Sequence, residues 1–243
     1  KKTNPEIDAN VAENLVVALK EFKEELLFVL SNRVLFNFFT HNNLSKNHFA
    51  IDNSTISEER ISKFITAFLA DDLIAFFSRK LSEKTYESFE ELDYFLDLKR
   101  FLPEDTIYKM GSLVFSKLDF AISQLSIMEL NDFSNIIYIR FKSFYDLISH
   151  FRTFETDHKI SKLLSLVIRF YKKKSNVEFF TSVIQSMAFY TAFDESINET
   201  LIKNRAAVSV FSVDVDESKS TFSVGGFIGL VCALIPFLVS KCS

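Results

Sequence analysis

The residues best suited to chemistry in this sequence are a few acidic and histidine side chains, beginning with Glu155 and His158. A Glu-x-x-His spacing puts both side chains on one face of a helix, as in the metal sites of helical bundles. A di-iron site needs two such pairs and further carboxylates, and the sequence has this spacing once. His41, His48 and His150 have neither H-E-x-x-H spacing nor companion cysteines. We therefore predict no metal site, no cofactor and no catalytic residue.

Two acidic motifs are better explained by ordinary surface structure than by a metal-binding function. Asp71 and Asp72 resemble the start of the aspartate-rich Mg²⁺ motif of all-α terpene synthases, but Ala75 stands where that motif has an acid. A solvated helix face is the better interpretation. Asp214 and Asp216 resemble the metal-binding D-x-D of some glycosyltransferases, but without a βαβ context a turn is favoured. The first 220 residues contain a single glycine, which excludes the usual phosphate-binding loops.

The composition is typical of a folded helical protein. Hydrophobic residues make up 48% of the chain and charged residues 25%, which argues against disorder. Four glycines and three prolines in 243 residues are too few for a turn-rich β-fold, so we predict an all-α fold. The net charge of −4 argues against a nucleic-acid-binding body. The 29 phenylalanines are better explained by an AT-biased coding sequence than by a chamber for an apolar ligand.

Apolar residues recur at three- and four-residue steps along most of the first 205 residues, which predicts a single bundle of about seven helices. Thr55 and Glu58 have capping-box spacing at one helix start, Asp132 is a predicted cap, and Gly111 lies inside a helix, where it can mark close packing. Residues 40–56 are predicted to be the longest loop. The predicted helices cover 4–39, 57–81, 85–101, 103–128, 131–151, 157–174 and 176–193.

The first predicted helix carries one continuous apolar stripe and becomes apolar nearly all round from Leu26 to Phe39. Its second half is therefore expected in the core or at an interface. The stripe consists of Ile7, Val11, Leu15, Leu19, Phe22, Leu26 and Leu30.

The segment from Thr221 to Ser240 has twenty residues and no charge, about the length that a membrane-spanning helix needs. Eleven of its residues contribute roughly −0.3 to −0.6 kcal/mol each to insertion, or about −3 to −7 kcal/mol together, which its glycines and Pro236 reduce. A tail anchor, a GPI-attachment signal and a buried core segment all remain open. The predicted membrane tail consists of Phe222, Val224, Phe227, Ile228, Leu230, Val231, Leu234, Ile235, Phe237, Leu238 and Val239.

The chain therefore divides into a helical body (1–205), an extended linker or hairpin (206–220) and a hydrophobic C-terminal tail (221–243). The linker is predicted from its nearly alternating valines. Both cysteines, Cys232 and Cys242, lie in the tail, so the body has no disulfide framework.

The one basic cluster consists of Arg169, Lys172, Lys173 and Lys174, at the end of a predicted helix. Such residues complement the helix dipole, which is the simpler explanation. Beside a membrane they would also form a patch for anionic lipid headgroups.

These features favour a non-enzymatic, membrane-tethered helical interaction protein with an unidentified protein partner, placed at the cell surface rather than on the cytosolic side. The layout of a cysteine-free helical body and a possible GPI signal resembles small surface antigens of protozoan parasites. It also resembles tail-anchored regulators such as the Bcl-2 relatives, although their N-W-G-R segment is absent. The alternative is a soluble all-α carrier of a lipid or other apolar ligand, with the tail buried in the core.

Overall fold

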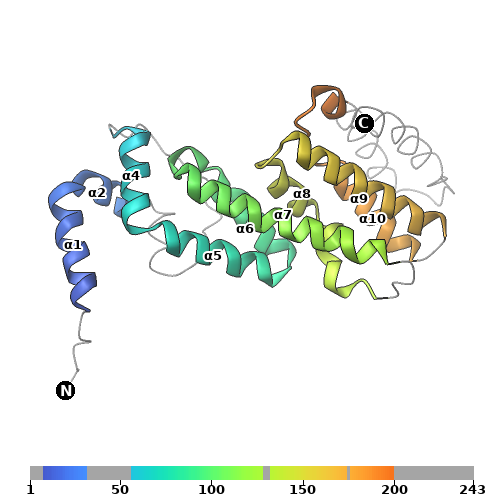
Figure 1. Ribbon diagram of the computed structural model, residues 1–243, viewed down its shortest axis with the longest axis horizontal. Helices are drawn as coiled ribbons and strands as arrows, with labels where there is room; N and C mark the ends of the chain where they lie inside the picture. The colour runs from blue at the N-terminus through green and yellow to red at the C-terminus, as the bar shows by residue number, and fades with distance from the viewer. Residues whose placement is uncertain (1–7, 32–55, 128–131, 174–175, 200–243) are drawn as a thin grey trace, which may run out of the picture. The chain divides into compact units, whose positions relative to one another are not determined.

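The computed structural model describes residues 8–31, 56–127, 132–173 and 176–199. Every regular element in these residues is helical and none is a strand, which confirms the predicted all-α fold class. In chain order (Figure 1) the elements are α1 (Ala9–Glu21), α2 (Lys23–Ser31), α4 (Glu58–Phe68), α5 (Ala70–Glu83), α6 (Tyr86–Leu96), the 3-10 helix η1 (Lys99–Phe101), α7 (Glu104–Ser126), the 3-10 helix η2 (Ser134–Arg140), α8 (Lys142–Ser149), α9 (Phe154–Lys172) and α10 (Val177–Met187).

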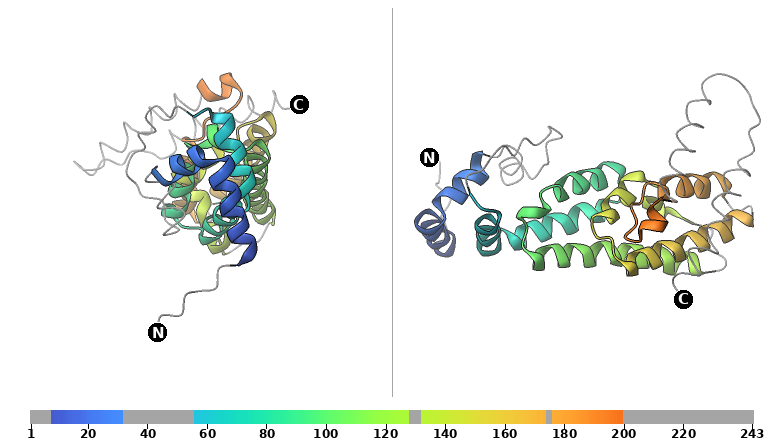
Figure 2. Two further views of the ribbon diagram at one scale, coloured as in Figure 1. Left: turned by 90° about the vertical axis from the view of Figure 1, so that its left-hand side faces the viewer. Right: turned by 90° about the horizontal axis from the view of Figure 1, so that it is seen from above.

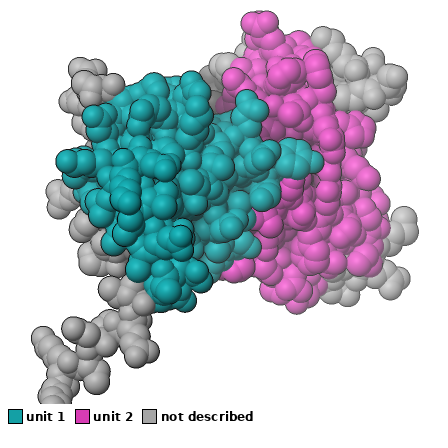
Figure 3. Space-filling model, turned by 60° about the vertical axis from the view of Figure 1, so that its left-hand side comes forward, with its two compact units in different colours: residues 1–80, 94–110 teal, residues 81–93, 111–243 magenta. Residues whose placement is uncertain are grey.

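The chain forms two units, coloured separately in Figure 3. Unit 1 comprises residues 1–80 and 94–110, and unit 2 comprises residues 81–93 and 111–243. The boundaries between them fall within α5, α6 and α7. The prediction of a single bundle of seven helices is therefore not confirmed.

Two predicted long helices of unit 1 are each divided by one non-helical residue. Phe22 (φ −129°, ψ 34°) separates α1 from α2, and Leu69 (φ −131°, ψ −11°) separates α4 from α5. Backbone hydrogen bonds flank the bend at Phe22: its amide donates to the Ala18 carbonyl at 3.0 Å, and its carbonyl accepts from the Leu26 amide at 2.9 Å.

The bend at Phe22 brings its partly buried ring against α4. The ring centroid lies 5.9 Å from that of Phe64 and 5.7 Å from that of Phe68, both in α4. Burial of an aromatic ring outweighs the small cost of an irregular backbone residue. Most of the remaining core of unit 1 is apolar, and its buried residues include Ile61, Ile65, Leu73, Phe76, Phe77, Phe95, Leu96, Leu98 and Phe101.

Side chains cap the N-termini of α4 and α10, and one predicted cap is corrected. The N-cap of α4 is Ser57, whose hydroxyl accepts from the Arg60 amide at 3.3 Å, so the predicted Thr55–Glu58 box is wrong in position. The α10 cap is Asn176, in the left-handed conformation (φ 45°), and its side chain accepts from the Phe179 amide. Asparagine tolerates this conformation better than most residues do.

In unit 2, the single helix predicted over 131–151 is wrong. The segment forms η2, then an extended residue at Phe141 (ψ 128°), then the short helix α8. The Tyr138 hydroxyl donates to the Lys117 carbonyl of α7 at 2.8 Å. The Tyr145 hydroxyl donates to the Ile139 carbonyl, also at 2.8 Å. The first bond joins this segment to α7 and the second joins α8 to η2, where the apolar spacing predicts one continuous helix.

Aromatic rings dominate the interior of unit 2. Phe180 of α10 has ring centroids of Phe133, Phe179 and Phe170 within 5.1, 5.2 and 5.3 Å. Gly111 of α7 confirms the predicted close packing, because a Cβ there would lie 2.9 Å from Cδ1 of Phe151. The phenylalanines thus fill the interior of this unit.

Several predictions lie outside the described residues. These are the start of the first helix at 4–7 and its end at 32–39, nearly all of the loop 40–56, Lys174, the linker 206–220 and the tail 221–243. They stay predictions.

Candidate interaction surface

The described feature that most resembles a binding site is the apolar face of α1. Val11, Leu15 and Leu19 are 58%, 53% and 50% exposed, and Val16 on the same side is 47% exposed. We call these four residues the α1 face. Ala18 is the buried residue of α1. Large apolar side chains gathered on one exposed helix face are typical of a surface that binds a partner.

The predicted apolar stripe is thus present, but its two halves have different surroundings. In the second half, the Phe22 ring packs against α4 and Leu26 is partly buried, although Leu30 is 49% exposed. In the first half, Val11, Leu15 and Leu19 are at least half exposed, although Ala18 on the neighbouring side of α1 is buried. In the views of Figure 2, α1 lies at the edge of unit 1, beside α2.

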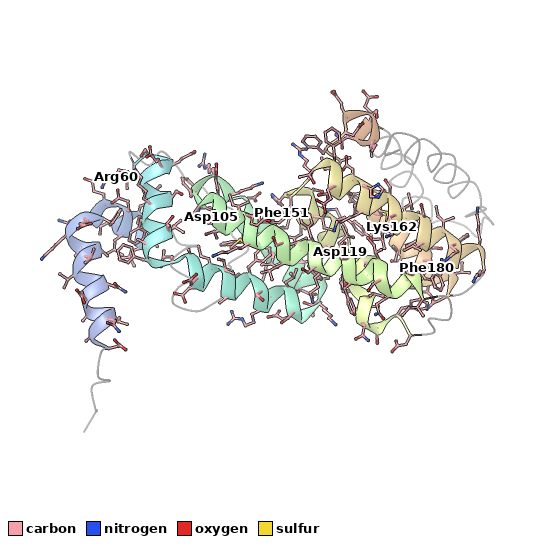
Figure 4. All side chains as sticks on the ribbon, viewed as in Figure 1. Arg60, Asp105, Asp119, Phe151, Lys162 and Phe180 are labelled. Carbon is pink, nitrogen blue, oxygen red and sulfur yellow. The ribbon has the colours of Figure 1, made fainter. Side chains whose placement is uncertain are left out.

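An ion pair holds α2, and through it α1, on the rest of unit 1. The Arg60 side chain of α4 donates from Nε to Oε1 of Glu25 in α2, at the place marked in Figure 4. Glu25 is fully buried, whereas the Arg60 side chain is half exposed. The hydrogen bond from Arg60 lowers the pKa of Glu25, outweighing the opposite effect of burial. Together with Phe22, this pair anchors the base of α1.

The predicted basic patch is only partly free for a ligand. Arg169 donates from Nη2 to the Leu125 carbonyl at 2.5 Å, and its guanidinium lies 5.3 Å from the Phe170 ring centroid. Arg169 therefore caps the C-terminal end of α7, where carbonyls lack helical partners. Lys172 and Lys173 are exposed at the end of α9.

The structure places Glu155 and His158 in the first two turns of α9. Oε1 of Glu155 lies 3.4 Å from Nζ of Lys159. This Nζ donates at 2.6 and 2.7 Å to both carboxylate oxygens of Asp119 in α7, the residue labelled in Figure 4. Glu155 thus takes part in an ion-pair network. In the part of the chain that the structure describes, no three His, Cys, Asp or Glu residues are close enough to hold a metal ion.

The other acidic and histidine residues take up separate positions. Asp71 and Asp72 are exposed in the first turn of α5, as expected for a solvated helix face. His150 follows α8, and its Nε2 lies 2.8 Å from Oδ1 of Asp93 in α6. His41, His48, Asp214 and Asp216 lie outside the described residues.

A buried polar cluster around Asp157 was not anticipated. Asp157 is 2% exposed and accepts hydrogen bonds from the Tyr190 hydroxyl (2.5 Å) and from the amides of Phe193 (3.1 Å) and Asp194 (2.8 Å). Burial raises the pKa of Tyr190, and the neighbouring carboxylate raises it further. The cluster ties residues 190–194 to the start of α9, so the predicted helix 176–193 ends at Met187.

The sequence contains one signal for this cluster. Asp157 stands three and seven residues before Ile160 and Leu164, on the side of α9 that faces the interior. A charged residue at an interior position of an amphipathic helix requires hydrogen-bond partners. The partners themselves come from a segment more than thirty residues later, which spacing within α9 does not reveal.

Two hollows bear on the idea of an apolar-ligand carrier. The apolar one lies within unit 1 between Val29, Leu69, Leu73 and Leu98 and has a volume of about 10 Å³. Ligand pockets are usually about 300–1,000 Å³. The larger one, in unit 2, has about 340 Å³ but is open, and charged residues line it together with phenylalanines: Asp132, Arg140, Glu178, Phe133 and Phe179. Neither resembles a lipid chamber.

Among the helices of the described ranges, none is both long enough and apolar enough to cross a bilayer. The predicted tail lies outside those ranges.

Comparisons with known proteins add no assignment: no family model, no curated protein and no solved structure matches this chain. A functional proposal therefore depends on the residues themselves.

Proposed function

We propose that this protein is a non-enzymatic helical interaction protein tethered to a membrane by residues 221–243. The observation that carries the proposal is the α1 face, an exposed apolar surface on an otherwise well-packed helical protein. The body presents this surface to a protein partner, and the tail confines the body to the membrane.

The tether is supported by the composition of the tail. Its uncharged run of twenty residues, Thr221 to Ser240, matches the length of a bilayer-spanning helix. Residues 206–220 would serve as the extended linker between body and membrane. We place the body at the cell surface, with the tail acting as a GPI-attachment signal or as a membrane anchor.

Fractionation of cells that express the full-length protein tests the tether. We expect the protein in the membrane fraction, resistant to high salt. Release by phosphatidylinositol-specific phospholipase would identify a GPI anchor, and retention would identify a membrane-spanning tail. Leu230→Asp, near the centre of the tail, adds about 2.5–3.5 kcal/mol of insertion cost and should shift the protein toward the soluble fraction.

The matched control is Ile127→Asp, which introduces the same charge at an exposed apolar residue of the body. It should leave the membrane fraction unchanged. A wild-type protein found wholly in the soluble fraction would contradict the tether.

The alternative, a soluble carrier of an apolar ligand, is less well supported because rings and aliphatic side chains fill the described interior. A carrier should co-purify with a lipid. Extraction of the purified protein followed by mass spectrometry should detect no stoichiometric lipid if the interaction proposal is correct.

A further inference from the structure

The open hollow of about 340 Å³ in unit 2 lies where η2 and α10 pack side by side, and we call it the η2–α10 hollow. The two elements run in the same direction. At their first end the Phe133 ring stacks on the Phe179 ring, with 5.2 Å between the centroids. At their second end the Ser186 hydroxyl donates to the Arg140 carbonyl at 2.7 Å. Because seven residues separate Phe179 from Ser186, the two ends lie about 10 Å apart along α10.

The charged residues of the η2–α10 hollow are divided between these two ends. Asp132 and Glu178 each precede one of the stacked phenylalanines, so both lie at the first end. Hydrogen bonds from the Ser134 amide (2.8 Å) and hydroxyl (2.9 Å) position the Asp132 carboxylate and lower its pKa. Arg140 lines the hollow from the second end. The hollow is therefore acidic at one end and basic at the other.

The opposite charges of the hollow do not pair with each other. In the part of the chain that the structure describes, neither Arg140 nor Glu178 forms an ion pair, and both residues are exposed. The apolar part of the lining consists of the buried Phe133 and Phe179 and the half-buried Ile137. Aromatic rings attract cations, so they reinforce the preference of the acidic end for a positive group.

We propose that the η2–α10 hollow binds a zwitterion in which an ammonium group is joined to a phosphate, as in the headgroup of phosphatidylcholine. The ammonium group lies at the end that holds Asp132 and Glu178, and the phosphate lies beside Arg140. A guanidinium group matches the geometry of phosphate oxygens. A simple anion would be repelled by the two carboxylates and a simple cation by Arg140, so a ligand with both charges fits best.

This inference rests on the proposed function, because a body tethered to a membrane is surrounded by lipid headgroups at high effective concentration. A weak site is then sufficient. Both ion pairs would be open to solvent, so we expect a dissociation constant on the order of millimolar for a soluble headgroup analogue. The hollow is open and lined by charges, which suits the headgroup and not the acyl chains.

Saturation-transfer difference NMR of the full-length protein in a maltoside detergent tests the site. Phosphocholine is the probe, and its methyl protons report binding. Choline is observed in the same way, and inorganic phosphate is added as a competitor at constant ionic strength. We expect saturable binding of phosphocholine, and binding of choline or phosphate that is weaker by at least about twofold, because each retains one of the two ion pairs.

Substitutions at the two ends of the hollow should affect different halves of the ligand. Arg140→Gln should weaken the binding of phosphocholine and phosphate about two- to fivefold without weakening that of choline. Glu178→Gln should weaken phosphocholine and choline to a similar extent without weakening phosphate. The matched controls are Arg152→Gln and Glu195→Gln, at exposed residues of unit 2 outside the hollow, and they should change nothing. All four residues are exposed, so the fold should persist, which circular dichroism checks.

Glycerophosphocholine distinguishes a lipid headgroup from free phosphocholine as the ligand. It carries the phosphodiester of a lipid, whereas phosphocholine carries a monoester with more negative charge. A site for lipid headgroups should bind glycerophosphocholine within about threefold of phosphocholine. Binding that is weaker by about tenfold or more would contradict a lipid as the ligand.

Two results would overturn the inference as a whole. One is the absence of saturable phosphocholine binding up to tens of millimolar, and the other is wild-type binding by both Arg140→Gln and Glu178→Gln. A protein that does not bind the probe but still fractionates with membranes would refute the headgroup site and not the tether. A protein that binds the probe but stays in the soluble fraction would refute the tether and not the site.

Discussion

Two amphipathic helices of similar sequence pattern, α1 in unit 1 and α9 in unit 2, differ in where their apolar faces lie. Ile160, Leu163 and Val167 of α9 are buried, whereas Val11 and Leu15 of α1 are more than half exposed. The difference comes from the neighbours: α9 packs against α10, while α1 packs against α2 at its C-terminal end. An apolar stripe therefore predicts which face of a helix is suited to packing. It does not predict whether another part of the same chain covers that face.

The largest loss of stability should come from a substitution in the buried core of unit 2. Phe180→Ala removes a fully buried ring from the phenylalanine cluster of unit 2 and should lower the free energy of unfolding by about 3–5 kcal/mol. Urea unfolding followed by circular dichroism measures this loss. Gln185→Ala, at an exposed residue of the same helix, is the control and should change stability by less than about 0.5 kcal/mol.

The Asp157 cluster should give the next largest effect. Tyr190→Phe removes the hydroxyl that donates to Asp157 and leaves a buried carboxylate oxygen with one donor fewer, at a cost of about 1–3 kcal/mol. Thermal unfolding at neutral pH measures it. Tyr171→Phe, in the same unit, is the comparison variant and should cost less. Equal effects of the two substitutions would show that the cluster adds nothing to stability.

Gly111→Ala tests how tightly unit 2 is packed. Alanine improves helix propensity by about 1 kcal/mol, but its Cβ would lie 2.9 Å from the Phe151 ring, and overpacking costs about 1–3 kcal/mol. We expect a net loss of about 1 kcal/mol in urea unfolding. Gly111→Ala combined with Phe151→Leu should recover part of it. A stabilised single variant would show that the Phe151 ring moves aside freely.

Glu25 should make unit 1 sensitive to acid. Arg60 holds the folded-state pKa of Glu25 below its ordinary value of 4.5, so its contribution is present above that pH and is lost as the pH falls through the folded pKa. Glu25→Gln should therefore flatten the loss of stability below about pH 4.5. Glu59→Gln, at an exposed carboxylate whose pKa is lowered by Lys63, should flatten it less. Identical pH profiles for Glu25→Gln and wild type would contradict this role.

The smallest effect on folding should come from the α1 face itself. Leu15→Ala removes a side chain that is 53% exposed and should change the free energy of unfolding of the monomer by less than about 0.5 kcal/mol. Urea unfolding at low protein concentration measures it. A loss of 2 kcal/mol or more would mean that the chain covers this face, and the contrast between α1 and α9 would disappear.

Strong local signals in the sequence were sufficient to predict a helix and its start. The helix predicted over 103–128 is α7, because Pro103 sets its start and Glu104 and Asp105 occupy its first turn. They did not predict the irregular residues Phe141 and Phe22. Near Phe141 the Tyr138 hydroxyl bonds to the Lys117 carbonyl of α7, and the Phe22 ring packs on α4. Spacing alone carries no information about such partners.

The candidate surface was also predictable only in part. The stripe through Val11, Leu15 and Leu19 follows from helical spacing, but its exposure depends on what packs beside α1. The role of Arg169 was likewise hidden, because its acceptor, the Leu125 carbonyl, belongs to another helix 44 residues earlier. Arg169 and Lys172 lie in the last turn of α9, as the helix-dipole explanation expects, and the bond from Arg169 to α7 is an additional role.

The three buried tyrosines of unit 2 give the protein an optical reporter of its own. Burial raises the pKa of Tyr138, Tyr145 and Tyr190 above the ordinary phenol value of about 10, and the chain has no tryptophan to mask their signal. Because the raised pKa favours the folded state below pH 10 and opposes it above, alkaline titration should open this unit. The part of the ultraviolet tyrosinate band that comes from these three of the seven tyrosines would then appear together with the loss of helical ellipticity, without any added dye.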